Sequence, residues 1–141
     1  MSTNLQSDSI YIPWGYEVPS FPSLVWPRTS HMDTKYYLYY TSDIWRFTMY
    51  WTMIMFCAVH FVAGCWAVLM NRRWTTVIVV AISMIIAFVE SVVSGSIIGA
   101  ILGLIYNAGS FTMSTWIPFV WAVVLVLTVI MTSYSMTAAV M

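Results

Sequence analysis

Three long apolar stretches run along the chain, and short polar segments separate them. The pattern predicts helices over about residues 43–70, 75–106 and 116–138. Each is long enough to cross a hydrocarbon core of ~30 Å, and the second is so long that it must tilt, bend or protrude. The sequence therefore predicts an all-α integral membrane protein, with three transmembrane helices within residues 43–141.

The polar segments supply residues that begin and end helices. Thr-Ser-Asp at 41–43 offers N-cap side chains for the first helix, and Asn-Arg-Arg at 71–73 leaves only a tight turn before the second. The second helix is expected to stop near Gly109, and Pro118 suits the first turn of the third. The N-terminus and the 107–115 loop then share one side of the membrane, opposite the arginine pair and the C-terminus.

Residues 1–42 have a different character from the rest of the chain. Prolines interrupt any continuous helix, and aromatic residues mixed with polar ones are typical of segments that settle at lipid headgroups. We expect an irregular, aromatic and proline-rich N-terminal segment at the membrane surface, with a partly disordered tail as the alternative. The prolines are Pro13, Pro19, Pro22 and Pro27, and the aromatic residues include Tyr11, Trp14, Phe21 and Trp26.

Composition excludes several classes of protein. The chain is 61% hydrophobic and only 7% charged, which rules out a water-soluble globule. Its formal net charge is zero and it has no basic run, so we expect no nucleic-acid partner. No phosphate-binding loop, paired metal ligands or nucleophile motif is present, so we predict a non-enzyme with no catalytic, cofactor-binding or metal-binding residues.

The second helix carries small residues at every fourth position. Such a row lets another helix backbone come close, which is a main source of association in lipid. Because a four-residue step drifts ~40° around a helix, we expect at least two neighbours along the row. These are either the other helices of this chain or a partner protein, with Ser91, Gly95, Gly99 and Gly103 as the helix-packing or partner interface. The full row is Ser83, Ala87, Ser91, Gly95, Gly99 and Gly103.

Two ionisable residues fall inside the predicted membrane region. Glu90 is the only acid after Asp43 and lies roughly 22 Å into the second helix, while His60 lies roughly 15 Å from the end of the first. An intramembrane carboxylate calls for a partner or a function, so we predict a polar pair of Glu90 with His60, or with a partner chain. Its role is open between a structural hydrogen bond, partner recognition, and proton or solute handling.

Several short motifs are similar to those of the transmembrane protein 170 family. Trp45 precedes His-x-x-Ala-Gly at His60, Ala63 and Gly64, and the second helix ends with Tyr106 shortly before Gly109. The third helix opens with Ile-Pro-Phe around Pro118, and the likeness covers roughly residues 43–136. The proline-rich segment has no match in the family, and Asn107 stands where the family tends to place a basic residue.

The resemblance implies a three-span, non-enzymatic protein of the endoplasmic reticulum, linked to membrane shape and lipid supply. Relatives look like membrane subunits of bridge-like lipid-transfer complexes. The implied lumenal N-terminus agrees with the charge pattern, because Arg72 and Arg73 sit in a short loop typical of the cytosolic side. We therefore expect an adaptor whose partners are membrane lipids and a larger membrane protein, such as a bridge-like lipid-transfer protein. The alternative is a small oligomeric channel or lipid scramblase built around Glu90.

Overall fold

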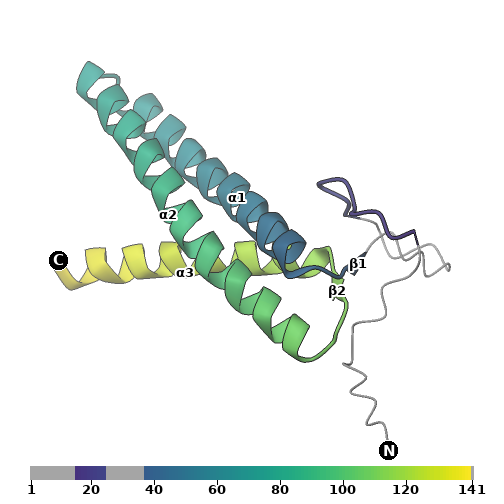
Figure 1. Cartoon of the computed structure of the whole chain (residues 1–141). Helices are drawn as coiled ribbons and strands as arrows, with labels where there is room; N and C mark the ends of the chain where they lie inside the picture. Colours follow the sequence, from purple (N-terminus) through teal and green to yellow (C-terminus); the bar gives the residue numbers. More distant parts are fainter. Residues whose placement is uncertain (1–14, 25–36, 141) are drawn as a thin grey trace, which may run out of the picture.

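A computed structural model describes residues 15–24 and 37–140 of the chain. Three helices make up most of it: α1 (Thr41–Met70), α2 (Trp74–Ala108) and α3 (Trp116–Val140) (Figure 1). All three are long and apolar enough to cross a membrane. The predicted fold class is confirmed, and the chain is a multi-pass membrane protein with three apolar spans.

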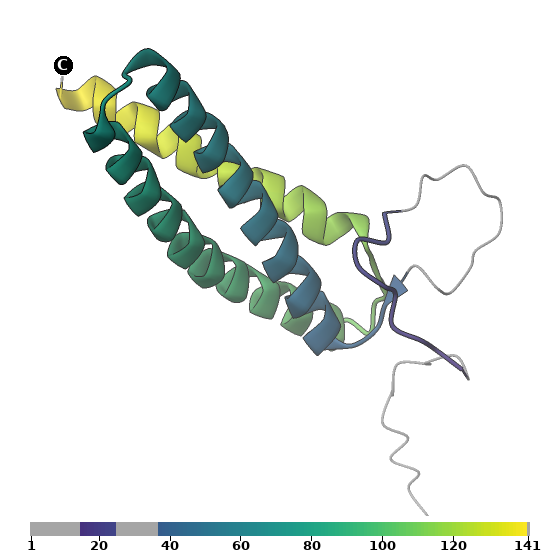
Figure 2. The ribbon, with the colours of Figure 1, turned by 90° about the horizontal axis from the view of Figure 1, so that it is seen from above.

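The helix α1 is central to the arrangement. It packs along α2 as an antiparallel hairpin and also contacts α3, whereas α2 scarcely touches α3. The α3 helix starts beside the first turns of α1, but its C-terminal end lies apart from the turn that joins α1 to α2 (Figure 1). The view from above shows residues 15–24 and the loop before α3 at the same end of the bundle (Figure 2).

The first helix begins two residues earlier than predicted. Its cap position is Tyr40, which makes no side-chain cap hydrogen bond, so the predicted capping role of residues 41–43 is wrong. Thr41 instead donates a hydrogen bond to the carbonyl oxygen of Gly103, at 3.4 Å. Asp43 lies in the first turn, where a negative charge suits the positive end of the helix dipole. The contact of Thr41 with α2 thus accounts for the earlier start of α1.

A small core closes the end of the bundle at which α1 begins. The strands β1 (Tyr37–Leu38) and β2 (Met113–Ser114) pair antiparallel, with Leu38 opposite Met113. Both of these side chains are fully buried and pack with Ile44, Phe47 and Leu102. The segments that flank the helices therefore tie the starts of α1 and α3 to the end of α2.

The described part of the N-terminal segment, residues 15–24, is irregular and lies against this end. The ring of Phe21 packs on Trp51 at 5.2 Å between centroids, and also on Phe47 and Tyr50. The hydroxyl of Tyr16 donates to the carbonyl oxygen of Tyr37 at 3.0 Å. Residues 1–14 and 25–36, which include Pro13, Pro27, Tyr11, Trp14 and Trp26, lie outside the described part of the chain.

Candidate functional site: the α1–α2 seam and the intramembrane polar residues

The glycines of α2 bring it into direct contact with the backbone of α1. A Cβ atom built on Gly95 would lie 3.1 Å from Thr52 Cβ, and one on Gly99 would lie 3.2 Å from Trp45 Cα. On Gly103 it would lie 2.5 Å from Thr41 Cγ2. These three glycines and Ser91, which is fully buried, form what we call the glycine seam. At each of the three glycines, an added Cβ atom would lie closer than ordinary van der Waals contact to α1.

The three glycines of the seam all meet the same helix of this chain. Every contact that limits Gly95, Gly99 and Gly103 comes from α1, and α3 scarcely touches α2. The three glycines thus share one neighbour, while the expectation of at least two neighbours along the whole row, from Ser83 to Gly103, stays a prediction. Because these positions have no side chain, the α1 backbone reaches a wider arc of the α2 surface than it would over larger residues.

The face that α1 presents to the seam includes two threonines that the sequence reading missed. Thr48 and Thr52 are fully buried. Their hydroxyls donate to carbonyl oxygens one turn earlier on α1, at 2.8 and 2.7 Å. The hydroxyl groups are thus satisfied without a partner from α2. The sequence signal for this buried face was the four-residue spacing of Thr48 and Thr52, shortly after Trp45.

Most of the motif residues that suggested the family sit at the seam or at the ends of helices. Trp45 covers Gly99, and Gly64 faces Val80, which leaves no space for a side chain. Tyr106 packs beside the small core, and Pro118 is fully buried near the start of α3. Two further motif residues, Ala63 and Gly109, are exposed.

The predicted stop of the second helix near Gly109 is confirmed, because α2 ends at Ala108. Gly109 keeps a right-handed backbone with φ −86°, and Ser110 takes the left-handed conformation with φ 52°. The Gly109 and Phe111 amides donate to Ile105 and Tyr106 carbonyls, which satisfies the end of the helix. The turn therefore depends on these hydrogen bonds and not on a left-handed glycine.

Glu90 lies on the opposite side of α2 from the glycine seam. Ile86, Val93 and Ile97, at helical spacing from it, are 58%, 54% and 56% exposed. The half-buried Glu90 side chain lines an open depression whose walls all come from α2. Ser94 donates to the Glu90 backbone oxygen at 2.7 Å, and within residues 15–24 and 37–140 the carboxylate makes no hydrogen bond or ion pair. Glu90 thus faces out of the three-helix bundle.

His60 faces a different neighbour. Its Nδ1 atom lies 3.0 Å from the carbonyl oxygen of Phe56, one turn earlier on α1. The ring lines a pocket between α1 and α3, whereas the depression at Glu90 belongs to α2 alone. The structure does not bring the two predicted partners together, because the local carbonyl holds the imidazole toward α3.

The described residues hold these two intramembrane ionisable groups on separate faces. No three His, Cys, Asp or Glu side chains among the described residues are grouped closely enough to hold a metal ion. What the arrangement offers chemically is one outward carboxyl group on α2 and one imidazole in an apolar pocket beside α3.

Comparisons with known proteins match nearly the whole described helical region. The family described as transmembrane protein 170A/B-like matches residues 37–141. The uncharacterized protein YPR153W of Saccharomyces cerevisiae is 40% identical over 131 residues, an alignment that covers 92% of this chain and 94% of the yeast protein. No solved structure shows a significant match.

Proposed function

Because the chain belongs to the transmembrane protein 170A/B-like family, we propose that it is a non-enzymatic adaptor of the endoplasmic reticulum membrane. It holds a larger membrane protein, of the bridge-like lipid-transfer type, as a subunit of a complex that supplies membrane lipid. The arginine turn at Arg72 and Arg73 faces the cytosol in this arrangement, and the N-terminus lies in the lumen.

The observation that carries the proposal is the outward position of Glu90. Ionisable residues within transmembrane helices are rare, and they almost always face a bundle interior or a water-filled cavity. Here the carboxyl group faces away from both α1 and the glycine seam, among exposed Ile86, Val93 and Ile97. Another chain must then cover this face of α2 and form the protein interior around Glu90. We assign the outer face of α2, centred on Glu90, as the docking surface.

The packing of α1 on the glycine seam also supports the outer face of α2 as the docking surface. A helix from a partner has no access to Gly95, Gly99 or Gly103, since α1 already occupies these positions. The outer face of α2 remains, and its exposed isoleucine and valine side chains provide apolar area around the single polar group. The partner helix is expected to carry a cation or a hydrogen-bond donor at the depth of Glu90.

Three of the four serines of α2 favour an adaptor over a channel or scramblase. Ser83, Ser91 and Ser94 all donate to carbonyl oxygens of α2 itself, at 2.7 to 2.8 Å. Their hydroxyl hydrogens are therefore committed to the helix backbone. The depression at Glu90 is otherwise lined by Ser94 and by isoleucine and valine side chains of α2.

The test compares Glu90→Leu with Ile86→Leu, a control one turn away on the same face. The tagged protein is purified in mild detergent, and the amount of a co-purified large membrane protein is normalised to folded adaptor. Glu90→Leu should lower this ratio at least about fivefold, the loss of about one charge-assisted hydrogen bond. It should not lower the thermal stability of the isolated chain, because an exposed intramembrane carboxyl group contributes nothing favourable there.

Two outcomes would contradict the proposal. An unchanged ratio with Glu90→Leu would exclude the outer face of α2 as the docking surface. A loss of folded protein with Glu90→Leu, but not with Ile86→Leu, would show that the carboxyl group serves the fold of this chain itself.

A further inference from the structure

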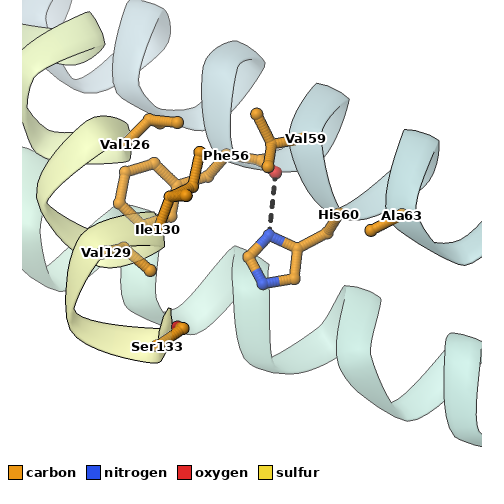
Figure 3. Close-up of a pocket in the computed structure, with 8 residues that line it drawn as sticks. All are labelled: Phe56, Val59, His60, Ala63, Val126, Val129, Ile130 and Ser133. Carbon is orange, nitrogen blue, oxygen red and sulfur yellow. Dashed lines mark hydrogen bonds between the residues drawn. The ribbon is translucent and has the colours of Figure 1, made fainter. Parts of the chain in front are cut away.

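A pocket of about 190 Å³ lies between α1 and α3 (Figure 3). One wall is formed by residues 56–63 of α1, and the other by residues 126–133 of α3. The lining is apolar apart from His60 and Ser133. The pocket is partly open along its side, and it does not include Glu90 or any residue of α2. It is therefore separate from the docking surface proposed above.

The hydrogen bond of His60 determines which chemistry the ring offers to the pocket. A backbone carbonyl oxygen only accepts hydrogen bonds, so Nδ1 must donate its hydrogen to Phe56. In the uncharged ring, Nε2 then carries a lone pair and acts as an acceptor. Figure 3 shows this second nitrogen on the side of the ring away from the α1 backbone. No described residue donates to it.

The depth of the pocket restricts what can donate to Nε2. His60 lies ten residues before Met70, or about 15 Å along the helix, near the middle of a hydrocarbon core of ~30 Å. A charged headgroup is costly to bring to that depth. An uncharged lipid whose polar group is a single hydroxyl has a much smaller barrier to entering it. A hydroxyl is also the donor that the Nε2 lone pair requires.

We propose that the α1–α3 pocket binds an uncharged, hydroxyl-bearing lipid, whose hydroxyl donates to His60 Nε2 and whose hydrocarbon contacts Phe56, Val126 and Ile130. An apolar cavity of ~150 Å³ accommodates a benzene ring, so this pocket holds a ring or a short chain segment and leaves the rest of the lipid in the bilayer. Diacylglycerols and sterols share this chemistry.

The test uses the full chain, purified and reconstituted in phosphatidylcholine vesicles. One arm adds a photoreactive diacylglycerol, and the other adds a photoreactive sterol. Each is compared with the same probe acetylated at its hydroxyl, which removes the donor and keeps the hydrocarbon. Labelled peptides are identified by mass spectrometry. The free hydroxyl probe should label residues 56–63 and 126–133 about fivefold more than its acetate, the gain from roughly one hydrogen bond.

Two variants separate the hydrogen bond from the shape of the pocket. His60→Phe removes the acceptor with little loss of apolar volume, so labelling by the hydroxyl probe should fall to the level of the acetate. His60→Gln keeps an acceptor oxygen and should retain most of the labelling. Ala63→Leu enlarges a side chain that lines the pocket and should reduce labelling by both probes. The comparison between a probe and its acetate on the wild-type chain decides the question even if a variant fails to fold.

Hydroxyl-dependent labelling by only one probe identifies that lipid as the source and supports the proposal. Equal labelling by both hydroxyl probes and their acetates would overturn it, as would no labelling of the pocket by either. Equally strong labelling by a photoreactive phosphatidylcholine would also overturn it, because the pocket would then hold ordinary acyl chains.

Discussion

The backbone of Trp45 lies directly against Gly99. A Cβ atom at Gly99 would sit 3.2 Å from both the Cα atom and the carbonyl oxygen of Trp45, closer than ordinary van der Waals contact. Because these Trp45 atoms belong to the backbone, they cannot move aside as the end of a flexible side chain does. The closeness of α1 and α2 therefore depends on the absence of a side chain at Gly99.

Substitution of Gly99 should destabilise the chain itself. Gly99→Ala forces the two helices apart and should cost about 1 to 3 kcal/mol in the free energy of unfolding, as overpacking does elsewhere. The measurement is unfolding in detergent, with Ala100→Leu as a control at an exposed position next to it. The amount of partner per folded protein should stay unchanged. An equal loss of stability from both substitutions would show that close packing at Gly99 is not the cause.

The separation of Glu90 from His60 predicts that their substitutions act independently. A double-mutant cycle with Glu90→Gln and His60→Gln should give a coupling energy below about 0.5 kcal/mol, as expected for groups without a shared contact. The free energies of unfolding of the four proteins supply the measurement. A coupling energy of about 1 kcal/mol or more would show that the two side chains interact in the membrane.

The docking of residues 15–24 should weaken at high pH through Tyr16. Burial raises the pKa of its hydroxyl from 10.0 to about 12, and this hydroxyl donates to Tyr37. As the pH rises, Tyr16 ionises at a lower pH when the segment is undocked than when it is docked. The stabilisation of the docked segment by the neutral hydroxyl is therefore complete below pH 10.0 and is lost between pH 10.0 and about 12. Protease cleavage within the segment should increase over that range.

Tyr16→Phe is the matched control for this pH effect. It lacks the ionisable hydroxyl, so cleavage should be faster than in the wild type below pH 10.0 and should not rise further through the ionisation of residue 16. An identical pH profile for both proteins would assign the change to another group.

The proposed orientation predicts a one-sided pattern of glycosylation. An acceptor sequence added at the N-terminus should be modified in the endoplasmic reticulum, and one added after Met141 should not, because the arginine turn favours the cytosol. The reverse pattern would show that the arginine turn lies in the lumen, and the proposed orientation of α2 and its outer face would then be reversed.

Much of the fold followed from local patterns. The apolar stretches are long enough to cross a bilayer, and lipid requires every backbone group within them to be satisfied inside the helix. The number of spans and their approximate ends were therefore readable from residues such as Asn71 and Pro118. The row from Ser91 to Gly103 likewise marked a close helix approach, since few other uses of such spacing exist in lipid.

Contacts between distant residues decided what the row and the polar residues do. The same glycines suit either an internal or an external helix, and only the position of Trp45 and Thr52 shows that α1 covers them. The side of α2 that remained uncovered then placed Glu90 outside the bundle, and the carbonyl of Phe56 turned His60 toward α3. Sequence alone determined the helices and the depth of each polar group, because both depend on local hydrophobicity and residue count. The rotation of each helix about its axis, which selects every neighbour, was decided only by the packing of all three.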